Sequence, residues 1–177
     1  MNALEAIYSR RSIRSFNGES LSESELNEIL KAAYAAPVGR AMYDSLSISV
    51  ISNKELLGKW EKLMATVTNN PDLHPFYGAP IVILVSSAMP SAQMSNVNYS
   101  NAATLVQNMA LAATELGIGA CHIWGAVGVL GGDAELVNAL KVPEGMTPCC
   151  AIALGRFDGE YELREIAPDR IRTEYIK

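Results

Sequence analysis

The sequence predicts an α+β fold, and three observations lead to that prediction. About five helix-like and four strand-like segments follow one another without strict alternation, which favours helices layered on a sheet. Apolar residues make up 49% of the 177 positions, and a chain of this length buries roughly 70% of its unfolded surface. One segment is apolar on nearly every side, as expected of a buried helix.

The first half of the chain combines helical periodicity with two kinds of strand pattern. The helical segments carry apolar residues three and four positions apart, and Ser22 with Glu25 forms a capping box before the second one. Apolar residues alternate with serines in one strand-like segment, whereas the other is a continuous β-branched run. In order, we expect a helix at 2–9, a helix at 22–34, a strand at 46–50, a helix at 53–67, a loop at 69–78 and a strand at 81–85.

The second half contains the long apolar helix. Asn101–Leu116 is apolar nearly all round, and Gly117 and Gly119 end it. Asp133 is the expected N-cap of a later helix. In order, we expect an irregular polar loop at 86–98, a helix at 101–116, a strand at 121–124, a helix at 133–140, a strand at 149–154 and a charged arm at 159–177.

Charged residues are scarce in one long stretch. Only 19% of the chain is charged, against about 25% in a typical soluble domain. No Asp, Glu, Lys or Arg occurs from Leu73 to Thr114, and after Glu115 the next charged residue is Asp133. This predicts buried surface beyond a monomer's own core, either an oligomer interface or a cofactor pocket.

Composition excludes several classes of protein. The net charge of −5 argues against nucleic-acid binding, and no apolar run is long enough for a transmembrane helix. The N-terminus lacks a signal-peptide pattern, so the expected location is the cytoplasm. Cys121, Cys149 and Cys150 give no disulfide framework, and with only His74 and His122 no metal site is expected.

A basic run carries the clearest chemical pattern. Arg10, Arg11 and Arg14 lie within five positions, with Ser12 between them. Arginine donates paired hydrogen bonds to phosphate oxygens, and serine adds a hydroxyl donor. From the residues alone, the run is also compatible with cations that simply complement the C-terminal dipole of the first helix.

Other chemical motifs are weak. Gly117 and Gly119 close a helix and precede a strand, which is the reverse of a dinucleotide-binding loop. An anion site and a large apolar volume with few acid–base residues suit an enzyme whose cofactor performs the reaction.

Five motifs in order resemble the FMN-dependent nitroreductase family over nearly the whole chain. They are Arg10-Arg11-Ser12-Ile13-Arg14, Ala35-Ala36-Pro37, Gly78-Ala79-Pro80, the segment from Gln107 to Cys121, and Ala153-Leu154-Gly155-Arg156. The resemblance implies one FMN-binding domain over residues 1–177, a three-layer fold with a central, mostly antiparallel sheet, and an obligate homodimer. A long buried helix would form the interface, so most of the charge-free stretch would be interface. Chain ends would reach across the partner, and FMN would lie between the subunits.

The same resemblance implies a role for each site residue. Arg10 and Ser12 would hold the phosphate, completed by Gly155, Arg156 and Arg164. Arg11 would reach the ribityl chain or the pyrimidine edge, and Arg14 would lie near N1 and O2 of the ring. Ile123, Trp124 and Gly125 would run along the flavin, while Pro37, Val38 and Gly39 of the partner subunit would lie near the ring.

The sequence departs from the family pattern after Pro37. Ala41 and Tyr43 replace residues that usually supply amide contacts to FMN, and Asn101 stands where an aspartate is usual. Tyr43 either stacks or hydrogen-bonds near the ring, or only packs.

The implied function is hydride transfer from NADH or NADPH through flavin N5 to a small nitroaromatic, quinone or similar acceptor. No protein residue need act as a nucleophile. One alternative is a flavin-binding carrier or sensor without NAD(P)H turnover, and another is an FMN-free relative that binds a different phosphorylated ligand.

Overall fold

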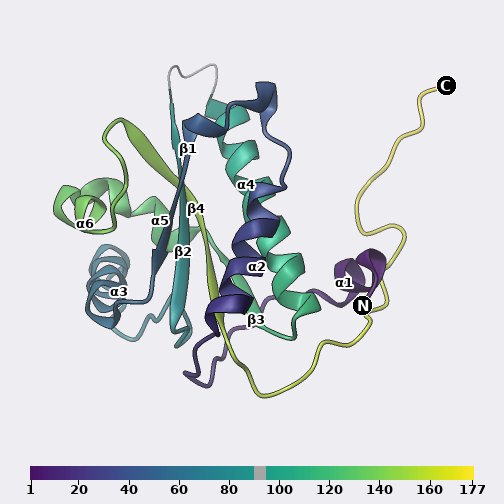
Figure 1. Ribbon diagram of the computed structural model, residues 1–177, viewed down its shortest axis with the longest axis horizontal. Helices are drawn as coiled ribbons and strands as arrows, with labels where there is room; N and C mark the ends of the chain where they lie inside the picture. The colour runs from purple at the N-terminus through teal and green to yellow at the C-terminus, as the bar shows by residue number, and fades with distance from the viewer. Residues whose placement is uncertain (90–94) are drawn as a thin grey trace.

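A four-stranded antiparallel sheet forms the middle layer of the molecule (Figure 1). The computed structural model describes residues 1–89 and 95–177. The strands are β1 (Leu46–Ile51), β2 (Ile81–Ala88), β3 (Gly119–Ile123) and β4 (Met146–Gly155), in the spatial order β1-β2-β4-β3. Helices cover both faces, which confirms the predicted α+β class.

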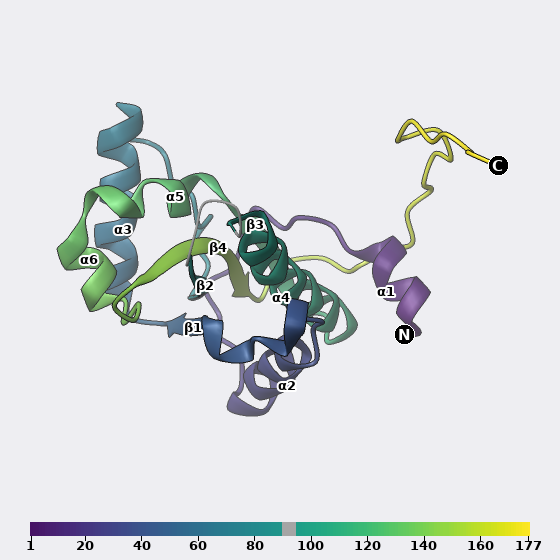
Figure 2. The same cartoon turned by 90° about the horizontal axis from the view of Figure 1, so that it is seen from above.

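The alternation of side chains along the strands divides the core into two halves. Ile81, Ile83 and Val85 of β2 face one cluster, and Val82 and Leu84 face the other. The first cluster lies under α2 (Glu23–Tyr34) and α4 (Ser95–Glu115). The second lies under α3 (Lys54–Thr68), α5 (Gly125–Gly128) and α6 (Ala134–Ala139), on the opposite face in Figure 2.

Local sequence explains where the main helices begin. The Ser22 side chain accepts from the backbone N–H of Glu25, and the Glu25 carboxylate accepts from that of Ser22, so the predicted capping box opens α2. Asp133 caps α6, also as predicted, and Asn53 caps α3. On α3, the buried Trp60 indole donates to the Ala126 carbonyl at 2.7 Å and thereby fixes α5 against it.

The expected loop at 86–98 is wrong at both ends. β2 continues to Ala88, and α4 begins at Ser95, six residues earlier than predicted; residues 90–94 of that loop lie outside the described residues. Polar residues in this region belong to a strand or a helix. Ser87 pairs with Thr147 in the β2–β4 ladder, and its hydroxyl donates to the Ser45 carbonyl. The Asn98 amide donates to the Ala88 carbonyl, which links α4 to the end of β2.

Smaller corrections concern β3 and the segment after it. The strand covers 119–123 instead of 121–124, so Trp124 lies outside it and precedes α5. The sequence predicts neither α5 nor the 3-10 helix η4 (Leu130–Gly132), because both are too short to show a helical period.

The charge-free stretch is explained in large part by the chain's own core. Seven of the eight residues of β2 are buried, as are nine residues of α4. These two elements are the central strand and the central helix of the α2–α4 layer, where an unpaired charge would be costly. The expectation that this stretch is mostly interface was therefore too strong.

The N- and C-terminal segments leave the sheet together. α1 (Ala3–Ser9) packs at the C-terminal end of α4, where the Met1 ammonium pairs with Glu115 at 2.8 Å. After β4 the chain forms no helix or strand, passes α1 and ends away from the body of the molecule (Figure 1).

Candidate functional site

The basic run lies in the loop that follows α1. The backbone N–H of Ile13 donates to the Ala120 carbonyl at 3.0 Å, and the Ile13 side chain is buried. This bond attaches the loop to β3. Arg10, Ser12 and Arg14 all lie close enough to Cys121 to lower the pKa of its thiol, although burial is the larger effect and raises that pKa overall.

Arg10 is the centre of a group of cations. Burial, and then the positive charge of Arg164, lower the pKa of Arg10, and Arg170 acts in the same direction. Arg164 comes from the C-terminal segment, where its Nε donates to the Tyr8 carbonyl of α1 at 2.9 Å. Two residues 154 positions apart in the sequence therefore place their guanidinium groups near each other.

No carboxylate compensates this positive charge. Among residues 1–89 and 95–177, no Asp or Glu oxygen lies within 4 Å of the guanidinium of Arg10, Arg164 or Arg170. Bringing like charges together in a half-buried place is unfavourable unless an anion binds there. The arrangement therefore favours an anion site over the simple complement to the dipole of α1.

Arg11 is held differently from its neighbours. Its Nη2 atom donates to the Glu160 carbonyl at 2.9 Å, so it ties the loop to the C-terminal segment. Tyr161 supports the same junction: its hydroxyl donates to the Ile118 carbonyl at 2.9 Å, and its ring packs edge-on against Phe157.

The end of β3 continues from the cation cluster. Ile123 is buried, whereas the Trp124 side chain is 53% exposed. A Cβ on Gly125 would lie 3.3 Å from the Met64 methyl group, so α3 approaches this position closely. At roughly 3.3 Å per residue, the path from Ala120 to Trp124 is about 13 Å long.

The segment Pro37–Tyr43 is anchored to α4 instead. The Gly39 backbone N–H donates to Asn101 Oδ1 at 3.0 Å, and Thr104 Oγ1 donates to the Pro37 carbonyl at 3.2 Å. Val38 is buried, and the Tyr43 side chain is half exposed, with its hydroxyl 3.5 Å from the Ala36 carbonyl.

The basic loop and the segment Pro37–Tyr43 lie at opposite ends of α4. Its 21 residues span about 31 Å. Asn101 holds Gly39 near the N-terminal end, whereas the basic loop is attached to β3 just beyond the C-terminal end (Figure 1). One chain therefore does not bring Pro37, Val38, Gly39 and Tyr43 to the basic loop.

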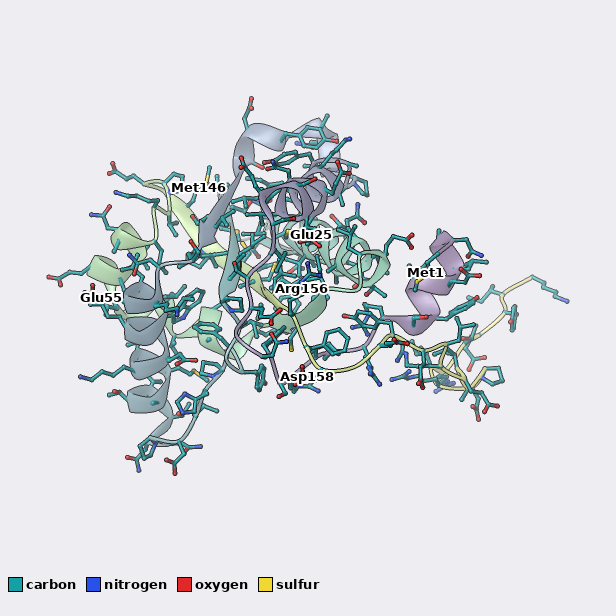
Figure 3. The ribbon with its side chains drawn as sticks, turned by 60° about the horizontal axis from the view of Figure 1, so that its bottom comes forward. Met1, Glu25, Glu55, Met146, Arg156 and Asp158 are labelled. Atoms are coloured by element: carbon teal, nitrogen blue, oxygen red, sulfur yellow. The ribbon has the colours of Figure 1, made fainter. Side chains whose placement is uncertain are left out.

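Gly155 and Arg156, at the end of β4, contact other parts of the fold. Arg156 Nη2 binds Glu25 Oε1 at 2.6 Å, which connects the end of β4 to the start of α2 (Figure 3). A Cβ on Gly155 would lie 2.6 Å from Pro80 Cδ, so this glycine serves close packing. In this chain both residues have structural partners.

Comparison with known proteins identifies the family. A sequence model described as the nitroreductase family matches residues 7–156. The chain belongs to the nitroreductase family.

Individual relatives agree with this assignment over nearly the whole chain. A protein of Methanothermobacter thermautotrophicus named "Putative NADH dehydrogenase/NAD(P)H nitroreductase" is 32% identical, over 98% of this chain and 87% of the relative. The "FMN reductase (NADPH)" of Bacillus subtilis is 28% identical over 87% of this chain, and the match spans 65% of that enzyme. A crystal structure of a Desulfitobacterium hafniense nitroreductase with bound FMN superposes with a TM-score of 0.84 at 26% identity, covering 99% of this chain and all of that one.

The possible metal ligands and the cysteine thiols are distributed as follows in the described residues. Residues 1–89 and 95–177 contain no group of three His, Cys, Asp or Glu side chains placed to hold a metal ion. All three cysteines are buried, and burial raises the pKa of Cys149 to about 11 and that of Cys150 to about 12. No helix of the described residues is long and apolar enough to cross a membrane.

Three contributions were missed from the sequence. Arg170 and Tyr161 belong to the C-terminal arm, whose lack of periodicity gives no hint of what they face. Asn101 stood out only as a departure from the family pattern, whereas the structure makes it the acceptor that fixes Gly39.

Proposed function

We propose that this protein is an FMN-dependent oxidoreductase that uses NADH or NADPH to reduce a nitroaromatic, quinone or similar small acceptor. The observation that carries the proposal is the uncompensated cluster of Arg10 and Arg164 beside β3. Family membership and the FMN in related crystal structures support the choice of ligand.

The residues beside β3 suit the parts of FMN. Arg10 and Arg164 bind the phosphate, because they supply charge-assisted donors without an internal carboxylate. Ser12 adds a hydroxyl donor, and Arg14 lies further along the loop toward the ring, where a cation stabilises negative charge on reduced flavin. When bound, FMN supplies the chemistry, a two-electron hydride exchange at N5.

The end of β3 positions the ring. Trp124 and Gly125 follow β3 there, and Gly125 permits close approach of the backbone. His122 lies between this segment and the phosphate site, and burial, followed by Arg10, lowers its pKa, so it is neutral at pH 7. The chain's contribution is thus orientation, charge and exclusion of water rather than a nucleophile.

A homodimer completes the site in this proposal. Pro37, Val38 and Gly39 lie far from the basic loop of their own chain and would reach the ring of the partner subunit. The surface also supports a partner: the chain exposes 10471 Å², against roughly 8,400 Å² expected for a monomer of 19.1 kDa. Much of the excess comes from the extended arm, whose Leu163, Ile171 and Tyr175 are exposed.

Acceptor-dependent turnover tests the proposed function. Purified protein supplemented with FMN is expected to oxidise NADH or NADPH only when a nitroaromatic or quinone is present. Protein that binds FMN tightly but turns over with neither nucleotide would instead be a carrier or sensor. Failure to bind FMN at all would contradict the cofactor assignment and favour a different phosphorylated ligand.

A further inference from the structure

The turn at Gly39–Ala41 is strained in a way that its sequence does not require. Arg40 has φ 58° and Ala41 has φ 54°, two successive residues in the left-handed region. Neither is glycine, asparagine or aspartate, the residues that adopt this conformation most readily. Such strain persists only where the surroundings over-determine the backbone, and it concentrates at functional sites.

Several contacts hold the turn in place. The Ala41 N–H donates to the Val38 carbonyl at 3.0 Å, and the Met42 N–H donates to that of Gly39 at 3.3 Å. The buried Asn101 fixes Gly39 from α4, and a Cβ on Gly39 would lie 3.2 Å from Val97 Cγ1. The backbone of the turn is thus fixed, while its side chains are free to serve another purpose.

Arg40 carries a positive charge without an internal partner. Its side chain is exposed, and within residues 1–89 and 95–177 no carboxylate oxygen lies within 4 Å of its guanidinium. The N-terminal part of α4 beside it offers no counter-charge, because the chain has no charged residue from Leu73 to Thr114. Met42 and Tyr43, both exposed, add apolar surface next to it.

We propose that Arg40 selects substrates that carry an anionic group, by pairing with that group as the substrate approaches the ring. This rests on the proposed function, which places the 37–39 segment beside the FMN of the partner subunit. A fixed turn with an unpaired guanidinium and flanking apolar side chains suits an aromatic or nucleotide substrate bearing a carboxylate or phosphate.

Two matched pairs of substrates locate the anionic group. The acceptors are 4-nitrobenzoate and 4-nitrobenzyl alcohol, which differ by one negative charge. The donors are NADPH and NADH, which differ by one phosphate. In Arg40→Gln, the KM is expected to rise about fivefold for the more negatively charged member of one pair and to change less than twofold for its counterpart, a size typical of a partly exposed charge pair.

Three controls separate charge from fold. Arg40→Lys keeps the charge and is expected to restore most of the discrimination, and Lys54→Gln removes a distant exposed cation and is expected to leave it unchanged. The discrimination is also expected to shrink when the ionic strength rises from about 0.05 to 0.5 M, because salt screens exposed charges. If Arg40 had a purely structural role, the discrimination would depend neither on the charge at position 40 nor on the ionic strength.

The outcomes distinguish this inference from the function on which it rests. Selectivity within the acceptor pair assigns Arg40 to the acceptor, and selectivity within the donor pair assigns it to the extra phosphate of NADPH. Equal changes within both pairs, with turnover intact in the wild type, would overturn the role of Arg40 and leave the proposed function standing. Absence of turnover in the wild type would contradict both.

Discussion

Arg10 is the residue on which the proposed cofactor site depends most directly. Its guanidinium is half buried, lies near Arg164 and has no carboxylate within 4 Å among the described residues. A charged group in such a place costs free energy, and an oppositely charged ligand offsets that cost. The loop that carries it is fixed by the bond from Ile13 to β3, so the site is formed before ligand arrives.

Replacing Arg10 tests the phosphate assignment. Arg10→Ala is expected to weaken FMN binding about 10- to 100-fold, since a charge-assisted hydrogen bond is lost, while binding of riboflavin, which has no phosphate, changes little. Titration of flavin fluorescence measures both affinities. The exposed Lys62→Ala serves as the control for net charge. Equal weakening of both flavins would show that Arg10 does not bind the phosphate.

At this scale the sequence can group residues that are close together in the chain, but not pairs that are far apart in it. Arg10, Ser12 and Arg14 could be grouped from the sequence because they are adjacent in it, and their roles toward FMN stay predictions. Arg156 was expected at the phosphate, but its partner Glu25 lies 131 positions away, and no local pattern shows such a pair. Arg170 was missed for the same reason.

At the scale of elements, the start of α2 is held by its own capping box and by an ion pair from the end of β4. The backbone N–H of Ser22, then its hydroxyl, then Arg156 hold the pKa of Glu25 below its ordinary value. Glu25 therefore caps its own helix and joins it to the end of β4, next to the Asn17 N–H that donates to the Arg156 carbonyl.

Loss of this carboxylate is expected to make stability less dependent on pH. Glu25→Ala should lower the free energy of unfolding by about 1–2 kcal/mol at pH 7, from the lost cap and ion pair. Because the folded pKa lies below the unfolded one, the stabilisation is complete above the unfolded pKa and is lost as the pH falls through the folded pKa.

Urea unfolding at several pH values measures this dependence. The difference between wild type and Glu25→Ala is expected to shrink once the pH falls below about 4, near the ordinary glutamate pKa. Glu55→Ala, which removes only an exposed pair with Lys59, is the control and should cost about 0.5 kcal/mol or less. A constant difference down to pH 3 would contradict the assigned role.

The end of β4 depends on the absence of a side chain at Gly155. Gly155→Ala would place a Cβ 2.6 Å from Pro80 Cδ and 3.1 Å from Phe16 Cδ1, and is expected to destabilise the fold by about 1–3 kcal/mol through overpacking. Gly128→Ala, with nothing within 4 Å, should cause no loss. Thermal or urea unfolding compares the two, and equal stability would argue against the close packing.

Helices and strands were predicted correctly where a periodic apolar pattern extends over many residues. The prediction failed where polar residues lie within a helix or strand. All four strands and the five longer helices were expected. The start of α4 was missed because Asn98 and Ser100 resemble loop residues, although the Asn98 amide binds the Ala88 carbonyl. Tertiary partners of this kind are invisible in a single sequence.

At the scale of the whole molecule, one uncharged stripe of α4 is unused by the chain's own core. Tyr99, Ala103, Gln107 and Leu111 recur every four residues, and none of them is buried. The opposite face of the helix packs on the sheet and on α2. A stripe of this length without charge suits a second copy of the chain better than water.

Sedimentation velocity tests the dimer. The protein is expected to sediment at twice the chain mass of 19.1 kDa. Leu111→Glu should shift it toward the monomer and lower FMN occupancy, because the two subunits share each site in the proposed dimer. Val67→Glu, at an exposed position on α3, should leave the dimer intact. A monomeric wild type with full FMN occupancy would contradict the shared site.

The central claim is that reduced nicotinamide delivers a hydride to FMN held by this chain. Anaerobic titration of the FMN-loaded protein with NADH and with NADPH tests it most directly, with flavin absorbance as the readout. About one equivalent of at least one nucleotide is expected to bleach each bound flavin, and adding a nitroaromatic is expected to restore the absorbance. Flavin that stays fully oxidised in excess NADH and in excess NADPH would contradict it.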